Sequence, residues 1–342
     1  MNLKIKGILS NRFHETWVSW DLVHEWEDDF ADYFKIPMQS DKFTRKIHEC
    51  IILNRISKRI LGRIPETLVQ YLDSMPIFGS GGDKFLIFDM YPRSSYYGHM
   101  STRRNSIPVI IDFWKQTDLP AFYRAYRNCA LILISSLEVY NYLQRNACPL
   151  KIVHLPLSLP DRHKMVSVPK KIYDVVLPGR YNPVLTNYML EFESKYPDVE
   201  WVIRTTVDNE MQYKSNKRGL LGSFYKRSEY LKLISEGRIA FYSTPGMDDG
   251  FKRTGGFNPV TPRYLELLNA KCLMLGRYPH NEETDFYEVE KVCPRVESYE
   301  EFEKVLLQHL NASNPNWDTY SSILDKHWTS RRLALLEEIL KR

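Results

Sequence analysis

A glycine pair, a helix start and an arginine follow one another closely near residue 260. The segment 255–276 begins with two glycines, and Thr261 followed by Pro262 has the residue types of a helix N-cap and first helical position. Arg263 and Glu266 are three residues apart, so both lie on one face of the first helical turn. A helix N-terminus that carries an arginine can bind phosphate, and a glutamate one turn later can accept hydrogen bonds from a ribose. The segment therefore predicts a nucleotide-binding site.

Further cations lie close to this segment in the sequence. Lys252 and Arg253 precede the glycine pair, and the stretch 211–228 holds five lysines or arginines and no acid. When a phosphate leaves a substrate, negative charge grows on its oxygens, and cations and helix amides stabilise that charge. We predict that Lys252 and Arg253 contribute to this. The stretch 211–228 is expected to be a loop. Its cations could contribute to the same stabilisation, or the loop could be only a solvated, mobile face.

Group transfer that inverts the reacting carbon also needs a general base beside the acceptor hydroxyl. The candidates are Asp89, His99, Asp112 and His14, which stand at the ends of expected strands or in the loops that follow them. Asp112 could instead cap the next helix. No convincing Asp-x-Asp metal motif lies in a loop, so we expect no bound metal and no cofactor.

Strands alternate with helices along most of the chain. The expected strands cover 3–9, 84–90, 107–113, 130–135 and 151–155 in the first half, and 172–177, 200–204, 238–243 and 272–275 in the second. This alternation predicts parallel sheets of the Rossmann type. Ligands of such sheets bind outside the carboxyl ends of the strands.

Length and linker composition predict two domains. The 342 residues suffice for two domains with a core each, and a proline-containing polar stretch, 158–171, separates them. We predict an N-terminal domain at 1–165, a second domain at 166–315, and a C-terminal helical segment at 316–342 that packs back towards the first. The predicted fold class is α/β, with parallel sheets facing an interdomain cleft.

Charge and cysteine content limit the partners and the compartment. The net charge of +5 favours an anionic ligand but is weak for a dedicated nucleic-acid binder, so we predict no nucleic-acid partner. Five scattered cysteines without a CxxC pair are typical of reduced thiols in a cytosolic protein. A basic amphipathic helix expected at 42–61 could lie on an anionic membrane or be a solvated face. We therefore expect a cytoplasmic protein, with peripheral contact to the inner face of the membrane as a further hypothesis.

The second half resembles a known family over about residues 172–300. It is similar to the nucleotide-sugar-binding domain of GT-B glycosyltransferases of the group 1 type, especially the spore-coat-type and surface-polysaccharide branches. The similarity rests on the segments 173–180 (YDVVLPGR), 237–243 (GRIAFYS) and 261–276, which begins TPRYLE. The first half is similar only in the order of its strands and helices. The resemblance implies transfer of a sugar from a nucleotide-sugar donor to a glycan or lipid-linked glycan acceptor, without a metal.

The resemblance also implies roles for individual residues. Gly179 would let the backbone approach the donor, and Arg180 would neutralise its diphosphate. Many retaining members carry a glutamate eight positions before the residue that matches Glu266, whereas this chain has Asn258, so the sugar-contacting role could pass to a neighbour such as Asp248 or Asp249. The predicted donor-binding residues are Gly179, Arg180, Arg204, Lys252, Arg253, Asn258, Thr261, Arg263 and Glu266.

Other interpretations stay open. Asn258 also fits a degenerate protein that binds a nucleotide sugar or glycan without turnover, and a nucleotide-sugar epimerase of the same fold is a third hypothesis. A dehydrogenase is disfavoured because no GxGxxG follows the first strand. Gly179 could be a simple tight turn, and Arg263 with Glu266 could be an exposed ion pair.

Overall fold

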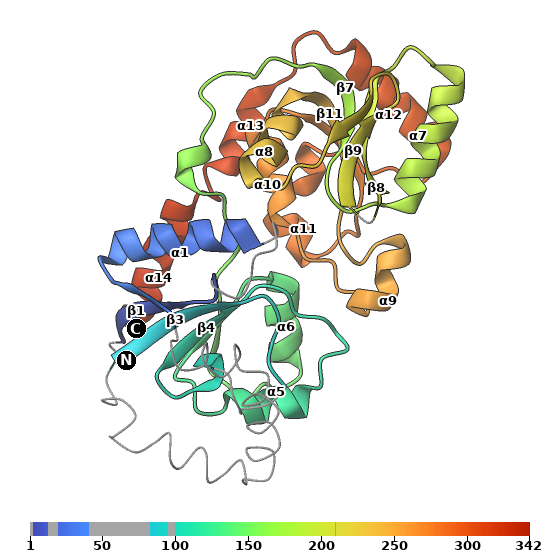
Figure 1. The fold of residues 1–342 in the computed structure, drawn as a ribbon. Helices are drawn as coiled ribbons and strands as arrows, with labels where there is room; N and C mark the ends of the chain where they lie inside the picture. Colours follow the sequence, from blue (N-terminus) through green and yellow to red (C-terminus); the bar gives the residue numbers. More distant parts are fainter. Residues whose placement is uncertain (1–2, 13–19, 41–82, 95–99, 209) are drawn as a thin grey trace. The chain divides into compact units, whose positions relative to one another are not determined.

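The computed structural model describes residues 3–12, 20–40, 83–94, 100–208 and 210–342 (Figure 1). The chain divides into two compact units. Unit 1 comprises Met1–Pro156 together with Thr329–Arg342, and unit 2 comprises Leu157–Trp328. The helix expected at 42–61 and the base candidates His14 and His99 lie outside the described residues.

Unit 1 contains a six-stranded sheet in the order β2-β1-β3-β4-β5-β6, and all of its described pairings are parallel. The strands are β1 (Lys4–Ser10), β2 (Met38–Ser40), β3 (Asp83–Asp89), β4 (Ser106–Ile110), β5 (Ile132–Ile134) and β6 (Ile152–His154). Its helices are α1 (Asp21–Phe34), α5 (Leu119–Tyr126), α6 (Leu137–Arg145) and α14 (Thr329–Lys341).

Helix α1 packs on this sheet through apolar residues at helical spacing. Trp26 and Phe30 are buried, and both rings lie against Phe88 of β3. The last helix, α14, lies beside α1 (Figure 1), where the Tyr33 hydroxyl donates a hydrogen bond of 2.8 Å to Glu337. The end of the chain is therefore part of unit 1.

Unit 2 contains a second six-stranded sheet, in the order β10-β9-β8-β7-β11-β12. The strands are β7 (Tyr173–Leu177), β8 (Trp201–Val207), β9 (Glu210–Ser215), β10 (Gly219–Gly222), β11 (Gly237–Ser243) and β12 (Leu273–Arg277). The helices are α7 (Pro183–Lys195), α8 (Arg227–Glu236), α9 (Phe251–Thr254), α10 (Pro262–Asn269), α11 (Glu282–Phe286), α12 (Tyr299–Asn311) and α13 (Trp317–Leu324). Strands β7, β8, β11 and β12 run parallel to their neighbours in this group, while β9 and β10 are antiparallel.

Local sequence explains where the helices of unit 2 begin. Asn182 accepts a hydrogen bond from the backbone of Leu185 and precedes Pro183, so α7 starts with a polar cap and a proline at its first position. Helix α10 starts at Pro262 after Thr261, as expected from the sequence, but the Thr261 side chain makes no capping hydrogen bond. Most of α10 is buried, and each fully buried leucine there contributes about 1.5–3 kcal/mol to stability.

Both sheets contain a point at which the strand order reverses. In unit 1 the chain passes from β1 to β2 on one side and then to β3 on the other, and in unit 2 it passes from β7 to β8 and later to β11 on the opposite side. Such switch points open a crevice at the carboxyl ends of the strands, where ligands of α/β sheets bind. We therefore expect ligand sites at the carboxyl ends of β1 and β3 and of β7 and β11.

The predicted α/β class with two Rossmann-like, mostly parallel sheets is confirmed. The prediction that 211–228 is a loop is wrong, because much of it forms the β9–β10 hairpin. Tyr213 and Ser215 are buried on alternate positions, and Gly219 supplies a left-handed φ of 75° at the turn. Within the described residues, no helix combines the length and the apolar character needed to cross a membrane.

Candidate functional site

A pocket of about 370 Å³ lies at the carboxyl ends of β7, β8 and β11. Its lining residues are Arg180, Tyr181, Asn182, Arg204, Ser243, Thr244, Pro245, Met247, Asp249, Gly250, Arg253, Thr261 and Arg263. A smaller hollow adjoins it and shares six of these residues, and Gly179 lines this hollow. The volume is within the range of small-molecule sites, and the position matches the switch point of the unit 2 sheet.

The lining of the pocket is strongly cationic, with four arginines against the single carboxylate of Asp249. Neither Arg204 nor Arg263 forms an ion pair with a carboxylate among the described residues. Burial, and to a smaller extent the positive charge of Arg263, lowers the pKa of Arg204. An arginine nevertheless stays charged in a protein, so the two side chains present positive charge that an anionic ligand would neutralise.

Gly179 fits this site because it has no side chain. Its φ is 75°, and a Cβ atom at this position would overlap the guanidinium group of Arg263. The Gly179 amide donates a hydrogen bond of 3.3 Å to the hydroxyl of Tyr213. The turn after β7 can therefore approach Arg263 as closely as it does only with glycine.

Polar atoms at the start of α10 are left without protein partners. The Thr261 amide donates to the Tyr242 hydroxyl at 3.3 Å. The Thr261 hydroxyl and Nε of Arg263 are buried, and neither has a hydrogen-bond partner among the described residues. An unsatisfied buried polar group costs about 1–3 kcal/mol, so a ligand that bonds to these atoms would recover that energy.

Three of the predicted donor residues line neither the pocket nor the adjoining hollow. Glu266 is only 4% exposed, and its carboxylate pairs with Arg227 at 2.6 Å. Asn258 accepts a hydrogen bond of 2.7 Å from Thr244 and donates one to the Gly256 carbonyl. Lys252 is exposed on α9. Glu266 and Asn258 thus have structural partners that their sequence neighbourhood does not reveal.

The two aspartates suggested as alternatives to Asn258 differ in their surroundings. Asp249 lines the pocket. Asp248 does not, because Arg277 and Asn182 hold its carboxylate. Of the two, only Asp249 is positioned to contact a ligand in the pocket directly.

The predicted base candidates that the structure describes both lie at the carboxyl edge of the unit 1 sheet. Asp89 ends β3, is 1% exposed, and accepts a hydrogen bond of 3.0 Å from Arg93. Burial raises the pKa of Asp89, although Arg93 acts in the opposite direction. Asp112 follows β4 and is half-buried, and its amide donates to the Met90 carbonyl. Asp112 is therefore the more accessible of the two carboxylates.

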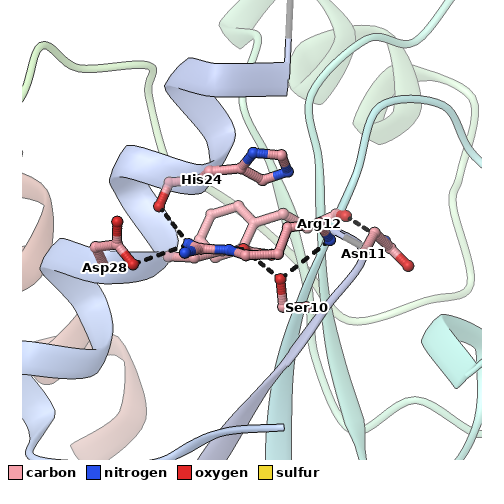
Figure 2. Close-up of polar contacts among 7 residues, drawn as sticks. Ser10, Asn11, Arg12, His24 and Asp28 are labelled. Carbon is pink, nitrogen blue, oxygen red and sulfur yellow. Dashed lines mark hydrogen bonds and ion pairs between the residues drawn. The ribbon is translucent and has the colours of Figure 1, made fainter. Parts of the chain in front are cut away.

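A buried carboxyl group at the β1/β3 switch point was not predicted from the sequence. Glu27 of α1 is fully buried and accepts a hydrogen bond of 2.6 Å from Ser10, the last residue of β1. Arg12 contacts Glu27 at 3.3 Å and also bonds to Asp28 and to the backbone oxygen of His24 (Figure 2). Glu27 interrupts the apolar face of a helix, and this interruption was the available sequence signal.

Glu27 also has an unusual protonation equilibrium. Burial raises its pKa to about 7, against the opposing effects of the Ser10 hydrogen bond and the Arg12 charge. One carboxylate oxygen, Oε1, has no hydrogen-bond partner among the described residues. The group therefore changes charge near neutral pH.

No three His, Cys, Asp or Glu side chains come together as metal ligands in the part of the chain that the structure describes. The described cysteines, Cys129, Cys148, Cys272 and Cys293, are free thiols.

Comparison with known proteins yields structural similarity only. No protein-family model and no curated protein matches the chain. The fold is similar to the N-terminal domain of Candida albicans trehalose-6-phosphate phosphatase, with a TM-score of 0.54, 11% identity, and coverage of 99% of this chain and 96% of that one. At this identity the similarity shows the fold alone.

Two further solved structures are more distant. The chain is similar to the GtfA/B complex, with a TM-score of 0.49, 10% identity and coverage of 81% of this chain and 60% of the other. It is also similar to the pneumococcal O-GlcNAc transferase GtfA in complex with UDP and GlcNAc, with a TM-score of 0.48, 9% identity and coverage of 80% and 59%. The chain therefore spans about three fifths of the length of these two proteins.

We predict that Glu27 makes the stability of unit 1 depend on pH. Its pKa is about 7 in the folded protein against 4.5 for an ordinary glutamate, so the folded state holds the proton more tightly. Its stabilising contribution is fully present below pH 4.5 and is lost as the pH rises through 7, by roughly 3 kcal/mol. Urea unfolding of the wild type and of Glu27→Gln at several pH values should show the difference between them changing across this window.

The control for this experiment is Glu338→Gln, which removes an exposed carboxylate from the same unit. Its unfolding curve should follow that of the wild type at every pH. Parallel pH profiles for the wild type and Glu27→Gln would show that Glu27 titrates normally.

Proposed function

We propose that the protein is a GT-B glycosyltransferase that moves a sugar from a nucleotide-activated donor onto a glycan acceptor. The observation that carries the proposal is the pair of arginines, Arg204 and Arg263, which lie at the β7/β11 switch point without a carboxylate partner among the described residues. A nucleoside diphosphate has the negative charge that such a pair can neutralise, and its phosphates can bond to the buried polar atoms of Thr261 and Arg263.

The pocket has the chemistry that departure of a nucleoside diphosphate requires. The bond between the sugar carbon and the phosphate oxygen breaks, and its electron pair stays on the oxygen. Arg180, Arg204 and Arg263 would stabilise this growing charge from fixed positions, which costs no reorganisation during the reaction. Gly179 would let the diphosphate approach the backbone, and Asp249 would accept hydrogen bonds from the sugar hydroxyls.

On the acceptor side, we assign the general base to unit 1. The acceptor oxygen forms the new bond to the sugar carbon, and its proton passes to a carboxylate. Asp112 suits this role better than Asp89, because Asp89 is almost fully buried and bonded to Arg93. His99 remains a candidate outside the described residues. In this scheme unit 1 binds the acceptor and unit 2 binds the donor.

The finer parts of the proposal rest on the sequence resemblance. They are an acceptor that is a surface glycan or its lipid-linked precursor, a place in cell-surface polysaccharide synthesis, and work at the cytoplasmic face of a membrane without a metal. The alternative is a protein that binds a nucleotide sugar without turning it over. The internal hydrogen bonds of Asn258 and the ion pair of Glu266 favour this alternative, because neither residue is available to the donor as placed.

A nucleotide-sugar panel tests the proposal. The panel consists of UDP, GDP, ADP and TDP and their common nucleotide sugars. One class should raise the melting temperature, with about 2.7 kcal/mol of stabilisation at 100 times Kd. The nucleotide sugar of that class should be consumed when an acceptor is present. Arg204→Ala should weaken binding at least tenfold, because a charged hydrogen bond contributes about 1.5–3 kcal/mol. Arg218→Ala, which removes an arginine of the hairpin that pairs with Glu200, is the control.

Each other outcome of the panel has a meaning. If no nucleotide or nucleotide sugar stabilises the protein, the proposed function is wrong. Stabilisation without consumption or transfer favours the binding protein, and interconversion of free nucleotide sugars favours an epimerase. Glu266→Ala is unsuitable as a control, because it would leave Arg227 buried without its counter-charge.

A matched pair of glycine variants tests the role of Gly179. Gly179→Ala and Gly219→Ala both place alanine at a φ of 75°, which costs about 1–2 kcal/mol, but Gly219 has open space around it. Only Gly179→Ala must displace the Arg263 guanidinium. We therefore expect similar melting temperatures and at least a tenfold loss of nucleotide affinity in Gly179→Ala alone, measured by calorimetry. Equal nucleotide affinities of the two variants would show that Gly179 has no role in nucleotide binding.

Asp112→Asn tests the assignment of the base. We expect transfer to slow by about 10²- to 10⁴-fold while the dissociation constant of the nucleotide is unchanged, because the base acts on the acceptor and not on the donor. Asp118→Asn is the matched control, since Asp118 caps α5 and asparagine also caps helices. Full activity of Asp112→Asn would exclude it as the base and direct the test to Asp89 and His99.

A further inference from the structure

Asp248 joins three loops at the carboxyl edge of the unit 2 sheet. Its carboxylate accepts a hydrogen bond of 2.8 Å from Asn182, in the loop after β7. It also accepts two from Arg277, the last residue of β12, at 2.9 Å from Nε and 2.7 Å from Nη2. Asp248 itself follows β11. One side chain thus connects the ends of three adjacent strands.

This contact is charged and largely shielded from water. The side chains of Asp248 and Arg277 are 12% and 15% exposed, and the two bonds form the bidentate geometry that suits a guanidinium and a carboxylate. Burial alone would raise the pKa of Asp248, but the hydrogen bonds from Arg277 and Asn182 lower it below its ordinary value. The carboxylate is therefore ionised at neutral pH, and the contact persists there.

The backbone of Asp248 is held in an unfavourable conformation. Its φ is 53°, in the left-handed region, which costs most non-glycine residues about 1–2 kcal/mol and an aspartate less. Such a conformation persists only where the surrounding contacts impose it, and residues of this kind cluster at functional sites. The contacts to Asn182 and Arg277 are the ones that can offset the cost here.

The loop that carries Asp248 forms one wall of the pocket. Asp249 and Arg253 line the pocket, and a Cβ atom on Gly246 or Gly250 would overlap backbone oxygens of the same wall. Arg253 donates a hydrogen bond of 2.9 Å to the Pro245 carbonyl. Because the loop is packed this tightly, its attachment to the sheet determines where its pocket residues lie.

Asn182, which bonds to Asp248, belongs to the pocket wall formed by the loop after β7. Asn182 lines the pocket and caps α7 through its side-chain oxygen, while its amide nitrogen bonds to Asp248. Arg277 extends the connection to the backbone oxygen of Val296. The contact therefore fixes the distance between the wall after β7 and the wall after β11.

We propose that Asp248 is a positioning residue of the donor pocket, which sets the affinity for the nucleotide sugar without touching it. The inference rests on the proposed function and deepens it. The Asp248 side chain holds Asp249 and Arg253 at a fixed separation from Asn182, so that the pocket is preorganised before the donor binds. Loss of the carboxylate leaves the two walls free to move apart.

Asp248→Gly is the direct test, because glycine removes the carboxylate and tolerates the left-handed backbone. Its matched control is Glu288→Gly, which removes an acid with a φ of 53° and ion pairs to Lys291 and Lys326, away from the pocket. Calorimetry below the melting temperature measures the binding of UDP, GDP, ADP and TDP to each protein. The nucleotide sugars of the nucleotide that binds are then titrated in the same way. We expect at least a tenfold rise in Kd for Asp248→Gly and no change for Glu288→Gly.

The outcomes separate this inference from the proposed function. If the wild type binds a nucleotide and Asp248→Gly binds it equally well, the positioning role is wrong while the function stands. If the wild type binds none of the probes, both are wrong. Should Asp248→Gly fail to fold, Asp248→Asn tolerates the same backbone conformation but loses the negative charge and one of the two oxygens that bond to Arg277. A Kd of Asp248→Asn that matches the wild type would also overturn the inference.

Discussion

The concentration of positive charge at the carboxyl ends of β7, β8 and β11 is the constraint on which unit 2 is built. Arg204 and Arg263 repel each other, and placing both beside one hollow is unfavourable unless the fold holds them there. The buried α10 carries Arg263, and β8, paired with the hairpin, carries Arg204. The packing of α10 and the pairing of β8 therefore hold together two like charges whose repulsion an anion would relieve.

The two units treat buried charge in opposite ways. At the edge of unit 1, Glu27 and Asp89 are carboxylates buried beside arginines, so that most of their charge is neutralised within the protein. At the edge of unit 2, Glu266 is bonded to Arg227 behind the pocket, and Arg204 and Arg263 of the pocket lining have no carboxylate partner among the described residues. The first arrangement suits control of protonation, and the second suits capture of an anion.

Local sequence predicted what local interactions decide. Threonine followed by proline predicted the start of α10, although the Thr261 side chain makes no capping hydrogen bond. The rule that ligands bind at carboxyl edges predicted that Arg180, Arg204 and Arg263 lie together. The partners of Glu266 and Asn258 could not be predicted in this way, because they depend on side chains brought in by other segments of the chain. The β9–β10 hairpin was not predicted for a different reason. Its many cations suggested a loop, and the alternation of buried Tyr213 and Ser215 with exposed residues was overlooked. Glu27 interrupts the apolar face of its helix in the sequence, but only the tertiary packing shows that its carboxyl group is buried beside Ser10 and Arg12.

The placement of α14 in unit 1 has a consequence for the order of folding during synthesis. Unit 1 is interrupted in the sequence by the whole of unit 2, which forms one continuous segment. The backbone contact between Leu3 and Leu340 can form only after everything between them has left the ribosome. Domains usually fold in order from the N-terminus. Here the later segment can complete its structure first, and the domain that begins the chain is the last to be finished.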